Sequence, residues 1–379
     1  MVRRPAAGQR ERRGVNGEDV RLLRTIAGGI VQLGEIASPG AFSLPYPADA
    51  QRALDQVALA CLLRGEPPPH SLPDLITWCA QRPVRDWPLR LPPDQAAPGD
   101  RLLDPHTRTP TQLCYEWALR VPDTGTELYE RQVILGAISL CRGASAPESY
   151  TAFRRLLIER PVLTRGELAL LHGEPDLQPV LDLIREQYRP APAASAIDGS
   201  FAACSRCRCL LVPAGADGWW CEQDRCRREG PARPGTRHRA DQEVLQLARP
   251  LRIFVTGPGR AEVDLERRLA ALGLTVEMWP GFDAYDLRVH LPDGRVWAID
   301  VKDRASPALL GMDAAPLPAA PPHDAAFLVI PHYRFRDRPD YREVFSHHCP
   351  PDAAQALTLC TDRELVRRAR RITEEARRA

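Results

Sequence analysis

The stretch Asp286-Leu-Arg-Val-His-Leu-Pro-Asp-Gly-Arg-Val-Trp-Ala-Ile-Asp-Val-Lys302 decides the fold of the last third of the chain. Apolar and polar side chains alternate on both sides of a Pro-Asp-Gly turn, which is typical of a β-hairpin. We therefore predict strands over residues 284–291 and 295–302. The odd-numbered positions face the core: Tyr285, Leu287, Val289, Leu291, Trp297, Ile299 and Val301.

The polar face of this hairpin carries two acids and a lysine. A turn centred on its aspartate pairs His290 with Val296 and places Asp286 across from Asp300, with Cβ atoms about 4.5–5.5 Å apart. Carboxylates at that separation repel each other unless a cation lies between them. With Lys302 alongside, they suit metal-assisted attack of water on a phosphodiester. The alternative is a solvated hairpin face with an exposed Asp/Lys pair.

A helix that carries acids precedes the hairpin. Residues 260–272 have helical periodicity, and Glu262 lies one heptad before Leu269. Glu266, one turn later on the same side of the helix, is the second candidate for an active-site acid. A strand over residues 274–279 follows.

This order of elements resembles the PD-(D/E)XK restriction-endonuclease superfamily, whose pattern is an acid, a hairpin and then Asp/Glu-X-Lys. Asp286 and Asp300-Val301-Lys302 match that pattern, and Glu262 matches the helical Glu of the family. The resemblance implies that Asp286, Asp300 and the Val301 carbonyl hold Mg²⁺ or Mn²⁺. It implies that Glu262 binds a second ion or orients water, and that Lys302 holds the attacking water or stabilises the transition-state charge. The implied products carry a 5′-phosphate and a 3′-hydroxyl.

Residues 252–303 are similar, more narrowly, to the restriction-endonuclease (REase) subunit of the bacterial pPIWI-RE islands. There such a protein accompanies a Piwi/Argonaute-like protein and a DinG-type helicase in defence against invading DNA. The resemblance implies these two partners and a DNA substrate, with R-loop and single-stranded forms included. A homodimer is a further expectation, because double-strand cutting by a single-site nuclease usually needs two copies. For the N-terminal half we expect only that its helices serve in docking.

Five of the eleven cysteines lie within residues 204–226. Four of them form a Cys-X2-Cys and a Cys-X4-Cys pair, which is the spacing of a zinc ribbon. A set of four thiolates leaves no open position on Zn²⁺, so we expect a structural ion. The expected ligands are Cys204, Cys207, Cys221 and Cys226.

The sequence leaves two alternative ligand assignments possible. Cys209 could replace Cys207, and His238 could replace Cys226. The ribbon's own hairpin is expected over residues 210–213 and 218–221. Arginines around it could track a phosphate backbone, or they could belong to a solvated connector.

Composition is that of a globular protein without a strong charge bias. The chain has 379 residues, enough for two or three domains, and a net charge of +2 from 51 basic and 49 acidic residues. Bulk charge therefore does not indicate a polyanionic partner. Residues 1–14 lack the apolar segment of a secretory signal, and no apolar run is long enough for a membrane span. Clustered cysteines suit metal binding in a reducing cytoplasm.

The predicted fold class is multidomain, α plus α/β, with a mixed sheet in the C-terminal domain. Within that domain we expect strands over 251–256 and 325–330, a turn at 257–259 and a C-terminal helix over 361–378. The excursion over 304–324 is either a substrate-gating loop or ordinary surface. The expected division is a disordered basic tail (1–16), an all-α region (17–190), a linker (190–200), a zinc ribbon (200–240) and a restriction-endonuclease-like domain (250–379).

The sequence thus predicts a Mg²⁺-dependent endodeoxyribonuclease of a prokaryotic anti-phage and anti-plasmid system. The alternative is a non-catalytic zinc-ribbon protein that binds nucleic acid or acts as an adaptor, with a decayed nuclease fold. The joint presence of Glu262, Asp286, Asp300 and Lys302 argues against decay.

Overall fold

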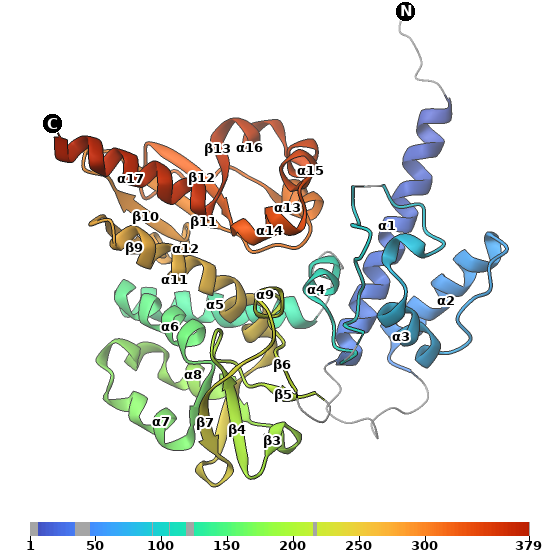
Figure 1. Ribbon diagram of the computed structural model, residues 1–379, viewed down its shortest axis with the longest axis horizontal. Helices are drawn as coiled ribbons and strands as arrows, with labels where there is room; N and C mark the ends of the chain where they lie inside the picture. The colour runs from blue at the N-terminus through green and yellow to red at the C-terminus, as the bar shows by residue number, and fades with distance from the viewer. Residues whose placement is uncertain are drawn as a thin grey trace, which may run out of the picture. The chain divides into compact units, whose positions relative to one another are not determined.

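The computed structural model describes residues 7–34, 46–92, 94–105, 107–118, 125–214 and 218–378, and these form two compact units (Figure 1). Unit 1 contains the N-terminal region through Leu128 together with residues 304–313 and 340–349. Unit 2 contains residues 129–303, 314–339 and 350–379. The boundary expected near residue 190 therefore does not separate the two units.

Unit 1 is helical. Helix α1 begins at Ala7, ahead of the start expected at Gly17, since the Ala, Gln, Glu and Arg residues of this segment have high helix propensity. Residues 1–6 of the expected tail lie outside the described residues. The elements are α1 (Ala7–Gly34), α2 (Ala48–Leu63), α3 (Leu72–Gln81), the 3-10 turn η2 (Val84–Asp86), α4 (Gln112–Ala118), α13 (Pro307–Asp313) and α15 (Tyr341–His348).

The excursion that follows the hairpin begins with a helix of unit 1. Buried Glu116 of α4 accepts hydrogen bonds from the backbone N–H groups of Ala305 at 2.7 Å and Ser306 at 2.9 Å. These donors lie just ahead of α13, where a helix has unpaired N–H groups and favours negative charge. Residues 304–313 are therefore neither a gating loop nor plain surface, because they are integrated into the core of unit 1.

Unit 2 begins with helices and a small sheet. Strands β1, β8 and β2 form an antiparallel sheet in which β8 is central, so the expectation of an all-α region over 17–190 is wrong at two short segments. These two segments, β1 and β2, are extended because each pairs with β8, which is distant in sequence. The elements are α5 (Gly125–Gly143), α6 (Pro147–Glu159), β1 (Val162–Thr164), α7 (Arg165–Leu170), the 3-10 turns η3 (Leu171–Gly173) and η4 (Pro175–Val180), α8 (Leu181–Gln187), β2 (Tyr188–Pro190) and β8 (Val244–Leu247).

A cysteine-bearing module follows. Its antiparallel sheet has the order β3-β4-β7, and a separate ladder pairs Val212 with Trp220 in the predicted hairpin. Part of its turn, residues 215–217, lies outside the described residues. The expected linker over 190–200 contains η5 and β3, because β3 pairs with β4. The elements are η5 (Ala193–Ser195), β3 (Ala196–Ile197), β4 (Ser200–Cys204), β5 (Val212–Pro213), β6 (Trp219–Trp220), α9 (Asp224–Arg228), β7 (Pro234–Arg239) and the 3-10 turn η6 (Ala240–Gln242).

The central sheet of unit 2 is mixed, as predicted. Its order is β13-β12-β11-β10-β9, with β9, β10 and β11 antiparallel and β11, β12 and β13 parallel. The strands are β9 (Thr275–Met278), β10 (Leu287–His290), β11 (Val296–Val301), β12 (Ala325–Ile330) and β13 (Leu357–Thr361). Strand β13 was not expected from the sequence. The remaining helices are α14 (His332–Asp337), α16 (Pro351–Ala356) and α17 (Asp362–Arg378). The short segment α12 (Pro280–Asp283) is not regularly helical, because Gly281 and Phe282 have positive φ.

The hairpin has the predicted register and the predicted core face. His290 pairs with Val296, and Val289 pairs with Trp297. All seven odd-numbered apolar positions from Tyr285 to Val301 are buried. Helices α11 (Gly257–Ala270) and α17 cover this face, where Leu269 and others join one core (Figure 1).

The strand expected over 251–256 and the turn expected over 257–259 are wrong. These residues form α10 (Arg249–Leu251), a π-helical turn η7 (Arg252–Thr256) and the start of α11. Tertiary contacts override the β-branched composition, since the buried Thr256 hydroxyl donates to the carbonyl of Leu157 at 2.7 Å. Gly259 permits close packing instead of a turn, because a Cβ there would lie 2.4 Å from Cδ1 of Ile158.

None of the helices in the described part of the chain is both long and apolar enough to cross a membrane.

Candidate active site and cysteine cluster

Asp286 and Asp300 lie at one ammonium group on the polar face of the hairpin. Continuing the ladder beyond the Leu287–Ile299 pair places residue 286 opposite residue 300. Nζ of Lys302 donates a hydrogen bond to Oδ1 of Asp300 at 2.8 Å and lies 3.7 Å from Oδ2 of Asp286. The structure thus brings together the two acids and the lysine in the expected register, while their catalytic roles stay predictions.

Asp286 is the acid that most needs a neighbouring cation. Its side chain is buried, and its Oδ2 accepts a hydrogen bond from the backbone N–H of Val301 at 2.6 Å. Burial first, then the charges of Glu262, Asp300 and Asp283, raise the pKa of Asp286 well above its usual value. A cation beside this carboxylate would favour its ionised form.

Lys302 supplies positive charge at the same place. Burial lowers its pKa, but Asp286 and Asp300 outweigh that effect and raise the pKa above the ordinary lysine value. Its side chain is 37% exposed. Lys302 is therefore positively charged at neutral pH and only partly buried.

Glu262, and not Glu266, is the helical acid at this site. It is 4% exposed, and its Oε2 accepts a hydrogen bond from Nε1 of Trp279 at 2.6 Å and lies 3.4 Å from Nη2 of Arg154. Burial raises its pKa, against the opposing effect of Arg154. Glu266 pairs instead with Arg155. Tertiary packing thus favours Glu262, the first candidate from the sequence, over Glu266.

A strained segment of backbone connects β9 to the hairpin. Three of its residues other than glycine have positive φ: Trp279 at 49°, Phe282 at 61° and Asp283 at 72°. Such conformations cost about 1–3 kcal/mol each and are often found at functional sites. Hydrogen bonds help to hold them, from Trp279 to Glu262 and from the Tyr150 hydroxyl to Oδ2 of Asp283 at 2.7 Å.

Sequence reasoning missed Tyr150, Arg154, Trp279 and Asp283 as neighbours of the site. The Pro-Gly dipeptide at 280–281 signals a break between strands, and that signal could have indicated the strained segment. Tyr150 and Arg154 lie on α6, far away in sequence, and carried no signal.

The donor chemistry of the hairpin fits a hard divalent cation. Asp286 and Asp300 offer carboxylate oxygens on one side of the sheet, and Mg²⁺ in proteins is usually held by one or two carboxylates plus water. Within the described residues, however, Glu262 does not form a group with these two acids that is close enough to share one ion. Its bonds to Trp279 and Arg154 engage it elsewhere. The two hairpin acids stay the predicted ligands.

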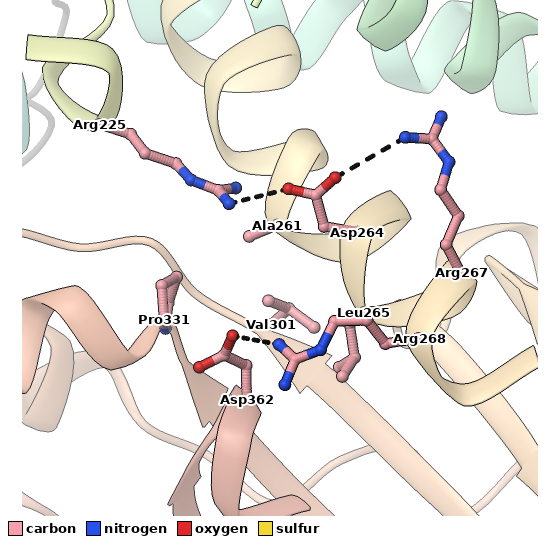
Figure 2. Close-up of a pocket in the computed structure, with 9 residues that line it drawn as sticks. All are labelled: Arg225, Ala261, Asp264, Leu265, Arg267, Arg268, Val301, Pro331 and Asp362. Atoms are coloured by element: carbon pink, nitrogen blue, oxygen red, sulfur yellow. Dashed lines mark hydrogen bonds and ion pairs between the residues drawn. The ribbon is translucent and has the colours of Figure 1, made fainter. Parts of the chain in front are cut away.

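A pocket of about 310 Å³ lies beside the carboxyl ends of the parallel strands (Figure 2). Asp264 pairs with Arg225 at 2.8 Å, and Arg268 pairs with Asp362 at 2.5 Å. Charges in the pocket are therefore largely balanced, and its lining does not single out an anionic ligand. The lining residues are Arg225, Ala261, Asp264, Leu265, Arg267, Arg268, Val301, Pro331 and Asp362.

The four predicted cysteine ligands form one buried cluster. Their sulfur atoms all lie within 4.8 Å of one another, and those of Cys207 and Cys221 are 3.4 Å apart. Sulfur ligands about 2.3 Å from a tetrahedral Zn²⁺ are about 3.8 Å apart, so the cluster could bind zinc. Hydrogen bonds from its neighbours, that of Cys207 first, lower the pKa of Cys204 and favour a thiolate there.

Neither alternative ligand belongs to this cluster within the part of the chain that the structure describes. Cys209 is buried, and its sulfur accepts a long hydrogen bond of 3.7 Å from Nε2 of Gln223. His238 lies on β7, where it pairs with Phe201. The structure therefore selects Cys207 over Cys209 and Cys226 over His238.

Two family models match the chain. Residues 22–164 match the model described as pPIWI_RE three-gene island domain Y, and residues 259–377 match the model described as REase associating with pPIWI_RE. No curated protein and no solved structure matches. The second match contains Glu262 and the whole hairpin, and it confirms the resemblance to the REase of these islands. The first match covers a helical region for which we predicted no family.

Proposed function

We propose that this chain is the metal-dependent endonuclease component of a pPIWI-RE defence island, and that it hydrolyses DNA phosphodiesters. The match to the REase of these islands indicates a nuclease component. The location of the proposed active site rests on one observation. Lys302 contacts both Asp286 and Asp300, and all three residues lie within the matched segment. The domain is proposed to have the PD-(D/E)XK fold.

Asp286 and Asp300 would hold the Mg²⁺ or Mn²⁺ ion in this proposal. A bound ion would polarise a phosphoryl oxygen and lower the pKa of a water molecule. Lys302, charged and partly exposed, would stabilise the negative charge that develops on the phosphate. Glu262 would orient the strained segment through Trp279 and would not ligate the same ion.

The cysteine cluster is proposed to hold a structural Zn²⁺ as a zinc ribbon. All four thiols are buried, so a bound ion would have no open position for substrate. The proposed partners are DNA, in duplex, single-stranded or R-loop form, and the Piwi/Argonaute-like and helicase proteins of the island. The match to domain Y of a three-gene island supports that setting.

Cleavage of plasmid, single-stranded and R-loop DNA with Mg²⁺ or Mn²⁺ tests the proposal. We expect cleavage by the wild type and its loss in Asp300→Ala and Lys302→Ala. Asp293→Ala is the matched control, because this acid lies in the exposed turn of the same hairpin and pairs with Arg295. Cleavage that persists in both site variants would refute the proposal.

Glu262→Gln and Glu266→Gln form a second matched pair on one helix. We expect a loss of activity for Glu262→Gln, whose side chain accepts a hydrogen bond from Trp279. A smaller change is expected for Glu266→Gln, which pairs with Arg155 and reaches the Trp279 ring only through that guanidinium. Equal effects of the two substitutions on cleavage would show that Glu262 has no specific role in the active site.

The second candidate function is a non-catalytic adaptor that binds nucleic acid or a partner protein. It is favoured by the observation that Glu262 does not group with the two hairpin acids as metal ligands among the described residues. Wild-type protein that binds DNA but cleaves none of the substrates, even with the other island proteins present, would support it.

A further inference from the structure

A second group of potential metal ligands lies within unit 1 and has no part in the proposed active site. It consists of Asp94, His347 and His348, whose ligand atoms all lie within 4.8 Å of one another. Nε2 of His348 is 2.7 Å from Oδ2 of Asp94. The two imidazole rings have centroids 5.0 Å apart and are nearly perpendicular, at 87°.

The fold holds in place both segments that carry this group, the end of α15 with its two histidines and the segment that contains Asp94. The two histidines end α15, and α13 packs so closely on it that a Cβ at Gly311 would lie 2.6 Å from the carbonyl oxygen of Phe345 and 3.1 Å from Cβ of His348. On the other side, Gln95 and Ala96, which follow Asp94, are buried. The ligands therefore lie on anchored segments.

The donor set is that of a borderline transition metal. Two imidazole nitrogens and one carboxylate oxygen are typical ligands of Zn²⁺ in sites that keep an open position. The C-terminal end of α15 also favours positive charge. Ligands about 2.0–2.1 Å from a tetrahedral ion are about 3.3 Å apart, so the His348–Asp94 separation needs only a small widening.

We propose that Asp94, His347 and His348 bind a divalent ion of the Zn²⁺ class, separate from the ion expected at the cysteines. An ion pair between His348 and Asp94 would account for the proximity of those two side chains but not for that of His347. A shared metal ion would account for the proximity of all three. The ion would connect two segments 254 residues apart in the chain. Because it closes so long a loop, it would stabilise the attachment of α15 within unit 1. The site does not depend on nuclease activity.

Metal content of the full-length protein tests this site directly. After saturation with Zn²⁺ and removal of free ion, we expect about two equivalents per chain in the wild type and about one in His347→Gln/His348→Gln. With Co²⁺ as the probe, the cysteine site should show intense thiolate-to-metal charge transfer in every one of these proteins. The second equivalent should show only ligand-field bands, which the double variant should lack.

Asp94→Asn serves as a milder variant in case the double variant does not fold, and it should weaken the second equivalent by about tenfold or more. His172→Gln is the matched control, an exposed histidine that belongs to neither cluster. A wild type that binds only one equivalent would overturn the proposal. So would a second equivalent that survives in both the double variant and Asp94→Asn.

Discussion

Nε of Arg334 donates a hydrogen bond to Oδ1 of Asp303 at 2.7 Å, and Nη1 of the same side chain donates to Oδ2 of Asp224 at 2.9 Å. Arg334 and Asp303 are 4% and 5% exposed. Asp303 directly follows Lys302, and Asp224 begins α9 between two cysteines of the cluster. One buried guanidinium thus connects the cysteine module to the strand end that carries the lysine of the candidate site.

Arg334→Met should destabilise unit 2 strongly. Removing one partner of a buried ion pair typically costs about 3–5 kcal/mol, since it leaves uncompensated charge. Here Asp303 loses this guanidinium, whereas Asp224 keeps its ion pairs with Arg227 and Arg228. Urea unfolding followed by circular dichroism would measure the loss. Arg336→Met is the control on the same helix, because its side chain is 58% exposed and pairs only weakly with Asp337. Similar unfolding free energies for the two variants would contradict a structural role for the bridge.

Gly259→Ala should destabilise the packing of α11 on α6. The added Cβ would lie 2.4 Å from Cδ1 of the buried Ile158, and overpacking of this kind costs about 1–3 kcal/mol. Thermal unfolding measures the effect. In the background of Ile158→Ala, which removes the clashing atoms, Gly259→Ala should cost little.

The control for this substitution is Gly136→Ala on α5, where the nearest atom to an added Cβ is 3.8 Å away. Alanine is favoured over glycine in a helix by about 1 kcal/mol, so this variant should be neutral or stabilised. A Gly259→Ala protein as stable as Gly136→Ala would show that Ile158 moves aside without cost.

Cys207→Ser and Cys209→Ser should differ in zinc content. Cys207 belongs to the four-cysteine cluster, whereas Cys209 is outside it. We expect Cys207→Ser to lose the zinc bound at the cysteines and Cys209→Ser to retain it, as measured by elemental analysis and by the Co²⁺ charge-transfer band. Loss in Cys209→Ser alone would instead make Cys209 the ligand.

Binding of Mn²⁺ at the hairpin should weaken as pH falls. Burial and the neighbouring acids raise the pKa of Asp286, so this carboxyl keeps its proton to a higher pH than an ordinary aspartate. The ion needs the ionised form and competes with that proton, so affinity should fall about tenfold per pH unit below the raised pKa.

Mn²⁺ titrations followed by electron paramagnetic resonance between about pH 5 and 8 would measure this competition. Asp286→Asn should bind weakly and without this pH dependence. An affinity in the wild type that stays constant over the whole range would show that Asp286 is not a ligand.

Local patterns were enough to predict the hairpin and its register. A period of two in apolar residues and a Pro-Asp-Gly turn determine which side chains share a face, and the structure has that pairing. The spacing of the cysteines likewise predicted the four that cluster, because a knuckle and a short hairpin are local structures.

Only the tertiary structure decided the features that join distant segments. The run 251–256 has the composition of a strand but is helical, since Thr256 and Gly259 pack against α6. The bridge through Arg334 and the group formed by Asp94 and two histidines have no signature in the sequence, because each joins segments about a hundred residues or more apart. Sequence periodicity reports the face of a single element, and it holds no information on which element that face will meet.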